Sequence, residues 1–343
     1  MSALRKVYRF VSAMQTGLVL LALIGTVSAL GSAFWPDAFF NTRLFKLLFF
    51  LLFLNITFCT ANRLSRFKRR FWKGFQDRRG WLRQFGMLLL HAGTVLVIAG
   101  GAVYAFYGQQ AVINLAEGET VDVSGFVKGQ RPFALHLNEF KIEFNQDGSP
   151  SQYYSQVAVL DDGAGVKKYS LSVNHPLCYG GVKAYQESFG YLVKARSMTG
   201  AGGEKEDLLT EGETLPLPGT ERVVKVFRYV PNFDPSCGMN SKTLRPDNPR
   251  VIFSVYEGNK LLGVGAAKFG ERLEIDDASS VVFTGVEPYT VLKLKSDPGL
   301  PSAMAGGVML AAGVLLAVFS RPSRLESDPG GEKDEMENLN RRE

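Results

Sequence analysis

Charged residues are missing from a long stretch of this sequence, and histidine is scarce throughout it. No Asp, Glu, Lys or Arg lies between Arg83 and Glu117, and the 343 residues include only three histidines. One of them, His91, lies inside this uncharged stretch, in the apolar segment LRQFGMLLLHAGTVLVIAGGAVYAFYG. An imidazole in hydrocarbon costs free energy unless something binds it, so ionisable residues within membrane spans are candidates for function. His91 therefore either contacts a partner chain or holds something that is not protein.

Cysteine is equally scarce, and several common catalytic motifs are absent. Cys59, Cys178 and Cys237 form no C-x-x-C pair, which excludes thioredoxin-like and zinc motifs of that kind. The sequence has no G-x-S-x-G, no H-E-x-x-H and no Gly-rich phosphate loop with Lys and Ser/Thr, so it predicts no catalytic residue. Cys178 and Cys237 fall in one predicted domain and would form a disulfide only if its compartment is oxidising and the geometry permits it. The sequence leaves that disulfide open.

Apolar runs, in contrast, are long and numerous. A span of the bilayer needs about 20 predominantly apolar residues. Four segments meet this requirement, at 11–34, 44–62, 82–107 and 300–319. The first has no A-x-A-like cleavage site followed by a polar start, so we expect a retained helix rather than a signal peptide.

The distribution of Lys and Arg predicts the orientation of these spans. Residues 63–83 contain nine Lys and Arg and one acid, Asp77, so the loop 63–81 is expected to be cytoplasmic. The N-terminus, 1–10, and the tail, 321–343, carry basic residues beside the first and last spans, which places them on the same side. Polar composition predicts that this tail is disordered. Topology explains the basic loop better than nucleic-acid binding does.

Residues 108–298 are predicted to form a β-rich domain on the exoplasmic side. Strand-like segments at 153–160 and 168–173 flank a turn rich in Asp and Gly, which is typical of a hairpin, and residues 231–249 read as a loop. His136 is expected to face solvent, whereas His175, in VNHPLCYGG, is a weak candidate for a ligand. The predicted fold is a membrane protein of α+β class, with four transmembrane helices and this large domain inserted between helices 3 and 4.

Glycines repeat every seven residues in the third and fourth spans. They are Gly86, Gly93 and Gly100, and Gly299, Gly306 and Gly313. Small residues at this spacing let another helix approach closely. His91 lies roughly 160° around the helix from Gly93, so a glycine face can pack within the chain while the histidine faces a partner or ligand. The apolar residues beside His91 suit the face of a porphyrin better than an ion path.

Several segments resemble the ResB-type (CcsB) proteins of system II cytochrome c biogenesis. The matching pieces include FKLLFFLLFLNITFCTANRLSRF, HAGTVLVIAGGAVYAFYG, KKYSLSVNHPLCYGGVKAYQESFG and EPYTVLKLKSDPGLPSAMAGGVMLAAGV, in that order along the chain. One departure is that Gly25-Thr26 is followed by Val-Ser-Ala-Leu, where the family often has Pro-Gln shortly after Gly-Thr.

The resemblance implies a function in handling haem. Such proteins form a complex with a CcsA/ResC-type membrane protein, which moves haem b across the bacterial cytoplasmic membrane and joins it to apocytochrome c. In this sequence His91 matches the histidine proposed in the family as an axial ligand of haem iron. One histidine in the membrane would leave the second axial position to the partner. Covalent attachment is then expected to rest with the partner, so this chain would be a non-catalytic subunit, with Arg78, Arg79 or Arg83 meeting the haem propionates.

Two alternatives stay open. The chain could be a membrane-anchored chaperone for apocytochrome c that never binds haem, in which case His91 only packs between helices. It could instead reduce apocytochrome thiols through Cys178 and Cys237, although no C-x-x-C pair supports that chemistry. Neither alternative, nor the main hypothesis, involves nucleic acid.

Overall fold

The computed structural model describes residues 3–34, 39, 42–72, 78–161, 165–199, 203–277 and 279–320. The chain divides into two compact units, a helical unit of Met1–Tyr107 and Pro298–Glu343 and a strand-rich unit of Gly108–Asp297. In chain order the strand-rich unit follows the helix α4 and precedes the helix α5. The predicted disordered tail, 321–343, lies outside the described residues.

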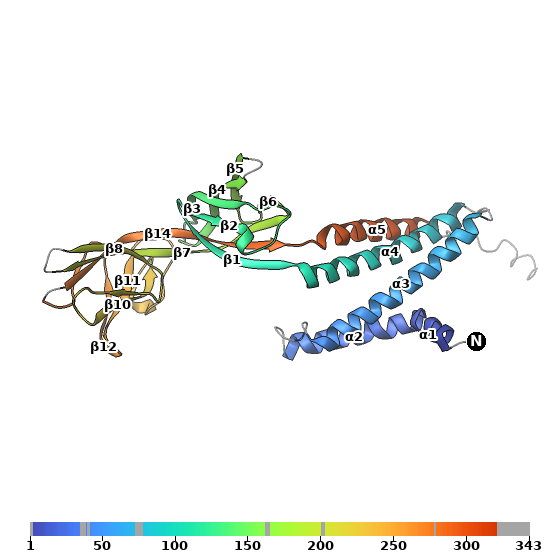
Figure 1. Ribbon diagram of the computed structural model, residues 1–343, viewed down its shortest axis with the longest axis horizontal. Helices are drawn as coiled ribbons and strands as arrows, with labels where there is room; N and C mark the ends of the chain where they lie inside the picture. The colour runs from blue at the N-terminus through green and yellow to red at the C-terminus, as the bar shows by residue number, and fades with distance from the viewer. Residues whose placement is uncertain are drawn as a thin grey trace, which may run out of the picture. The chain divides into compact units, whose positions relative to one another are not determined.

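The described residues of the helical unit form five α-helices, which are labelled in Figure 1. Their bounds are α1 Ala3–Val11, α2 Met14–Phe34, α3 Arg43–Trp72, α4 Arg78–Tyr107 and α5 Leu300–Phe319. Four of them, α2 to α5, are long and apolar enough to cross a membrane by length and composition. Each of these four covers most or all of one predicted apolar segment, and the ends differ in two places.

The first difference is a break between α1 and α2, within the predicted segment 11–34. The buried side chain of Asn55, on α3, donates hydrogen bonds from Nδ2 to the carbonyl oxygens of Val11 at 2.5 Å and Ala13 at 3.0 Å. The thiol of Cys59, one turn further along α3, donates to the carbonyl oxygen of Ser12 at 3.2 Å. These donors satisfy carbonyls that a helix break leaves open. Cys59 therefore helps to satisfy the backbone at this break.

The second difference concerns the predicted boundary at residue 62 and the predicted loop 63–81. The helix α3 continues through the basic residues to Trp72, and α4 begins at Arg78, so most of this segment is helical. Basic residues end an apolar run, but Arg and Lys are good helix formers, so they do not end the helix. Asp77 and Lys73 lie outside the described residues.

The helices α4 and α5 pack through their glycines, as the sequence predicted. A Cβ atom added at Gly86, Gly93 or Gly100 would lie 3.0, 2.7 or 2.6 Å from the carbonyl oxygen of Gly313, Gly306 or Gly299 respectively. The pairs run in opposite directions along the chain, so the two helices are antiparallel. Ser302 adds a hydrogen bond from its hydroxyl to the carbonyl oxygen of Leu96 at 3.1 Å. We call this contact the glycine seam.

The described residues of the strand-rich unit form three antiparallel sheets. The six-stranded sheet has the path β1 (Gln109–Ala116), β14 (Ser279–Ser296), β7 (Val182–Thr199) and β6 (Leu177–Tyr179), with β13 (Arg272–Glu274) beside β14 and β8 (Glu204–Leu209) beside β7. A second sheet has the order β2 (Thr120–Asp122), β3 (Ala134–Phe144), β4 (Pro150–Asp161) and β5 (Gly165–Ser172). The third has the order β12 (Lys260–Ala267), β11 (Arg250–Glu257), β10 (Arg222–Val230) and β9 (Thr214–Pro216).

The predicted hairpin is confirmed by the pairing of β4 with β5, from Tyr154 opposite Ser172 to Asp161 opposite Gly165. The tip of its turn, residues 162–164, lies outside the described residues. The predicted loop 231–249 is also confirmed, since its only regular elements are the short 3-10 helix η3 (Pro235–Cys237) and isolated bridges.

The long strands β7 and β14 serve two hydrophobic cores. The C-terminal half of β14 and the N-terminal half of β7 pack on the sheet β2–β5, where Leu135, Val157 and Leu292 are fully buried. The other halves pack on the sheet β9–β12, around Val193, Val224 and Phe283. The unit is therefore two sandwiches joined by one continuous ribbon of 18-residue strands.

Candidate functional site

His91 lies on α4, and its hydrogen bonding fixes which nitrogen carries the proton. The Nδ1 atom is 2.9 Å from the carbonyl oxygen of Met87, one turn earlier on the same helix. A carbonyl only accepts, so Nδ1 must donate, and the neutral ring then carries an unprotonated Nε2. Among the described residues nothing hydrogen-bonds to Nε2, and the side chain is partly exposed. This arrangement presents a lone pair suited to a metal ion, oriented by a backbone hydrogen bond.

The histidine and the glycine seam occupy opposite faces of α4. On the face of His91, Ile98 packs against a cluster formed by Ile24, Leu48 and Leu52 of α2 and α3. The Thr94 hydroxyl donates to the carbonyl oxygen of Leu90 at 2.8 Å, so its polarity is satisfied within α4. As predicted, the face contains no titratable group other than the imidazole.

A basic pocket of about 390 Å³ opens near this face, at the end of α3 that contacts α4. Its lining residues are Arg63, Arg66, Phe67, Arg69 and Arg70 of α3 and Gln84 of α4. Gln84 precedes His91 by seven residues and therefore lies on nearly the same side of α4, about 10 Å away along the axis.

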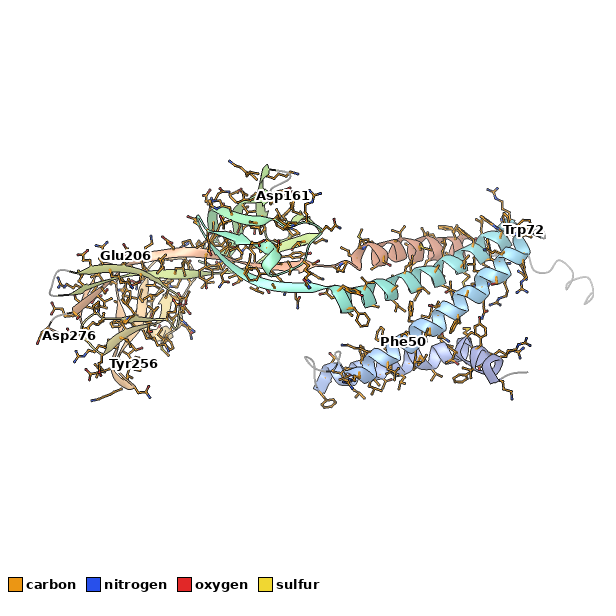
Figure 2. All side chains as sticks on the ribbon, in the orientation of Figure 1. Phe50, Trp72, Asp161, Glu206, Tyr256 and Asp276 are labelled. Atoms are coloured by element: carbon orange, nitrogen blue, oxygen red, sulfur yellow. The ribbon has the colours of Figure 1, made fainter. Side chains whose placement is uncertain are left out.

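Aromatic rings flank the basic pocket. The rings of Trp81 and Phe85, both on α4, are stacked with centroids 5.4 Å apart, and Phe67 of α3 lies 6.0 Å from Phe85 and 6.4 Å from Trp81. These contacts join α3 to α4 beside the arginines, close to the α3 end that Trp72 marks in Figure 2. The pocket lining thus combines positive charge with the ring of Phe67, and the rings of Trp81 and Phe85 lie next to Phe67.

The pocket is lined by arginines other than the three that were expected to meet haem propionates. Arg78, Arg79 and Arg83 are not among its lining residues, and Arg83 is exposed. The arginines of α3 occupy it instead because the helix continues past residue 62, which places Arg63, Arg66 and Arg70 on one face at helical spacing. This helical spacing is present in the sequence, whereas the predicted loop 63–81 implies no such face.

The other predicted residues do not come together into a site. His175 and Cys178 are both exposed, near β6, while Cys237 lies in η3 beside the other sandwich. All three cysteines are free, so the disulfide considered for Cys178 and Cys237 is absent. His136 shares a hydrogen bond of 2.8 Å with the Thr120 hydroxyl on the neighbouring strand β2. Among the described residues, no group of three His, Cys, Asp or Glu could hold a metal ion.

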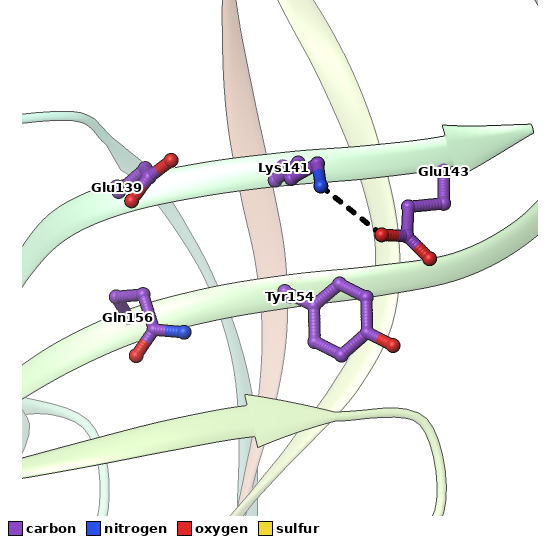
Figure 3. Close-up of a pocket in the computed structure, with 5 residues that line it drawn as sticks. All are labelled: Glu139, Lys141, Glu143, Tyr154 and Gln156. Atoms are coloured by element: carbon purple, nitrogen blue, oxygen red, sulfur yellow. Dashed lines mark hydrogen bonds and ion pairs between the residues drawn. The ribbon is translucent and has the colours of Figure 1, made fainter.

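A second pocket lies on the outer face of the sheet β2–β5 (Figure 3). Its lining residues are Glu139, Lys141, Glu143, Tyr154 and Gln156, and its volume is about 260 Å³. The Lys141 ammonium is paired with Glu143 at 3.1 Å, and both side chains are largely exposed. An exposed ion pair of this kind contributes little energy and orients no ligand, so we assign no function to this pocket.

Tyrosines gather where the two sandwiches meet. The rings of Tyr191 and Tyr229 are 4.7 Å apart, and Phe189 lies 5.6 Å from Tyr191. Burial, together with the neighbouring Tyr153, raises the pKa of Tyr191 to about 12. Burial and the neighbouring Tyr191 also raise the pKa of Tyr229. These tyrosines are neutral packing residues at physiological pH.

Comparison with known proteins gives consistent results. The model of the ResB-like family matches residues 75–286. The chain is 27% identical over 270 residues to "Cytochrome c biogenesis protein CcsB" of Picosynechococcus sp., covering 74% of this chain and 55% of that protein. It is 27% identical over 296 residues to "Cytochrome c biogenesis protein CCS1, chloroplastic" of Chlamydomonas reinhardtii, covering 72% of this chain and 48% of that protein.

The chain thus spans about half the length of the curated relatives it matches. A solved structure of "Cytochrome c Heme Lyase CcmF" aligns over 90% of this chain and 35% of its own, at 13% identity and a TM-score of 0.32. A score this low supports no argument about fold or function.

Proposed function

We propose, from the premise that this chain belongs to the ResB-like family, that it is a haem-handling subunit in cytochrome c biogenesis. In this proposal haem is the cargo, and His91 is an axial ligand to its iron during passage through the membrane. The proteins named for cytochrome c biogenesis among its relatives support the process. The assignment of His91 as a ligand is supported by its Nε2 atom, which no described residue hydrogen-bonds.

The residues present fit a haem. Histidine nitrogen is a common axial ligand of haem iron, and this one is already oriented by its hydrogen bond to Met87. The neighbouring face of α4 is apolar, as a porphyrin requires. The iron has two axial positions, and the described helical unit offers one histidine, so the second ligand would come from a CcsA/ResC-type partner.

The topology forms part of the proposal. The basic end of α3 is cytoplasmic, and the strand-rich domain, inserted between the third and fourth spans, lies on the exoplasmic side of the bacterial cytoplasmic membrane. Haem would enter at the basic side and leave at the other. The partner would carry out covalent attachment to apocytochrome c, while this chain binds and orients the haem, without a catalytic group of its own.

The test is the absorbance spectrum of the full chain co-purified with its partner. His91→Ala should abolish the Soret band or make it depend on added imidazole, which replaces the missing ligand. His136→Ala is the matched control, because it also removes an imidazole but from the strand-rich unit, and it should leave the spectrum unchanged. An unaltered Soret band in His91→Ala, at the same haem content, would refute the assignment of His91 as a ligand.

A second function, a chaperone that binds apocytochrome c without touching haem, is favoured by one observation. The strand β12 is at the edge of its sheet and exposes Leu261, Leu262 and Val264. Exposed apolar edges pair readily with extended chains. A Val264→Lys variant that stops apocytochrome binding while the haem spectrum of the complex persists would separate the two functions.

A further inference from the structure

The basic pocket between α3 and α4 has no counter-charge in the described part of the chain. The first 107 residues contain only two acids, Asp37 and Asp77, and both lie outside the described residues. No described residue forms an ion pair with Arg63, Arg66, Arg69 or Arg70. Arg66 and Arg69 each donate from Nε to a carbonyl oxygen of their own helix, at 3.3 Å, which leaves the terminal nitrogens of each guanidinium for a ligand.

The residues in and beside the pocket suit a ligand that is both flat and anionic. The guanidinium group binds carboxylates bidentately, and several together favour a ligand with more than one carboxylate. Phe67, Trp81 and Phe85 supply aromatic surface beside these donors. A free phosphate would use the charge but not the rings.

The position of the pocket relative to His91 narrows the class of flat anion that fits it. Gln84 lines the pocket and stands about two turns, or about 10 Å, from His91 on the same side of α4. Because His91 and Gln84 share one side of α4, a porphyrin held at His91 would have the pocket within reach along that side.

We propose that the pocket formed by Arg63, Arg66, Phe67, Arg69, Arg70 and Gln84 binds the two carboxylates of the porphyrin. The iron is then held at His91 and the carboxylate edge at the basic end of α3. This inference rests on the proposed haem-handling function and adds to it the group that orients the cargo. It assigns the carboxylates to the arginines of α3, in place of Arg78, Arg79 and Arg83.

The test compares three porphyrins on the full-length chain in nanodiscs of zwitterionic lipid. They are haem, iron-free protoporphyrin IX, which needs no axial ligand, and haem dimethyl ester, which lacks both carboxylates. The double variant Arg66→Gln/Arg70→Gln changes two exposed residues and should fold. It should weaken binding of haem and protoporphyrin IX by about ten-fold or more, and leave binding of the ester unchanged.

Arg83→Gln is the matched control, because it removes one charge at the same membrane border outside the pocket, and it should change none of the three affinities. Wild-type protein should bind the ester about as weakly as the double variant binds haem. Equal affinity of wild-type protein for haem and its ester, with no effect of the double variant, would overturn the inference. So would an effect of the double variant that appears only with anionic lipid, since the pocket would then hold a lipid headgroup.

The two proposals fail in different ways. If His91→Ala leaves haem binding intact while protoporphyrin IX still depends on Arg66 and Arg70, the carboxylate site stands and the assignment of the iron ligand is wrong. If His91→Ala abolishes the Soret band while the ester binds as well as haem, the assignment of His91 as the iron ligand stands. The assignment of the pocket as the carboxylate site is then wrong.

Discussion

Polar side chains in the helical unit mostly bond to backbone carbonyls, and His91 follows this rule with only one of its two nitrogens. Asn55 and Cys59 bond to the break between α1 and α2, and Thr94 and Ser302 bond within or across helices. Such bonds replace the water that the membrane lacks. The second nitrogen of His91 has no such partner among the described residues, and this difference makes the residue a ligand candidate rather than a packing residue.

Tyr191 allows a test of packing at the junction of the two sandwiches. Its pKa is raised to about 12, against about 10 in an unfolded chain, mainly by burial. Because the folded state holds this proton more tightly, its contribution to stability is complete below pH 10 and is lost as the pH rises from about 10 to 12. In chemical unfolding across this pH range, the free energy of unfolding should decline as the pH rises. The decline should be smaller in Tyr191→Phe. Equal pH dependence in the two proteins would contradict the burial of the hydroxyl.

At the scale of elements, the glycine seam holds α4 against α5 and leaves the opposite face of α4 for His91. We expect Gly93→Leu to separate the helices and to destabilise the protein by about 1–3 kcal/mol, because its Cβ would meet the carbonyl oxygen of Gly306 at 2.7 Å. Gly101→Leu is the control, because a Cβ there has no neighbour within 4 Å. The free energy of unfolding of both variants is measured in mixed detergent micelles. If Gly101→Leu lowers the free energy of unfolding as much as Gly93→Leu does, the loss does not come from the contact at the glycine seam.

The sequence predicted elements better than it predicted their ends and long-range partners. Hydropathy located all four apolar helices, and the seven-residue repeat indicated which faces of α4 and α5 pack closely. It did not indicate that α3 continues to Trp72, because hydropathy reports an apolar run and not the helix that contains it. The extended α3 carries the arginines that line the basic pocket, whereas the expectation for the propionates named arginines at the start of α4. The antiparallel pairing of β7 with β14 joins residues about a hundred positions apart, which no local pattern encodes.

For the whole molecule, the proposed topology places the strand-rich unit on one side of the membrane and both ends of the chain on the other. The free thiol of Cys178 is exposed and reports on this arrangement. In a Cys59→Ser/Cys237→Ser background, a membrane-impermeant maleimide should label Cys178 in intact spheroplasts. Labelling that requires permeabilised membranes would place the strand-rich unit in the cytoplasm and reverse the proposed direction of haem transport.

The scarcity of histidine makes the central assignment directly measurable. His136→Gln/His175→Gln leaves His91 as the only histidine of the chain. The chain purified without its partner, in this double variant, should still bind haem with the electron paramagnetic resonance signature of an axial imidazole. Adding His91→Ala should remove that signature. If the signature is lost in the double variant, or persists after His91 is also replaced, His91 does not hold the iron and the proposed function loses its main support.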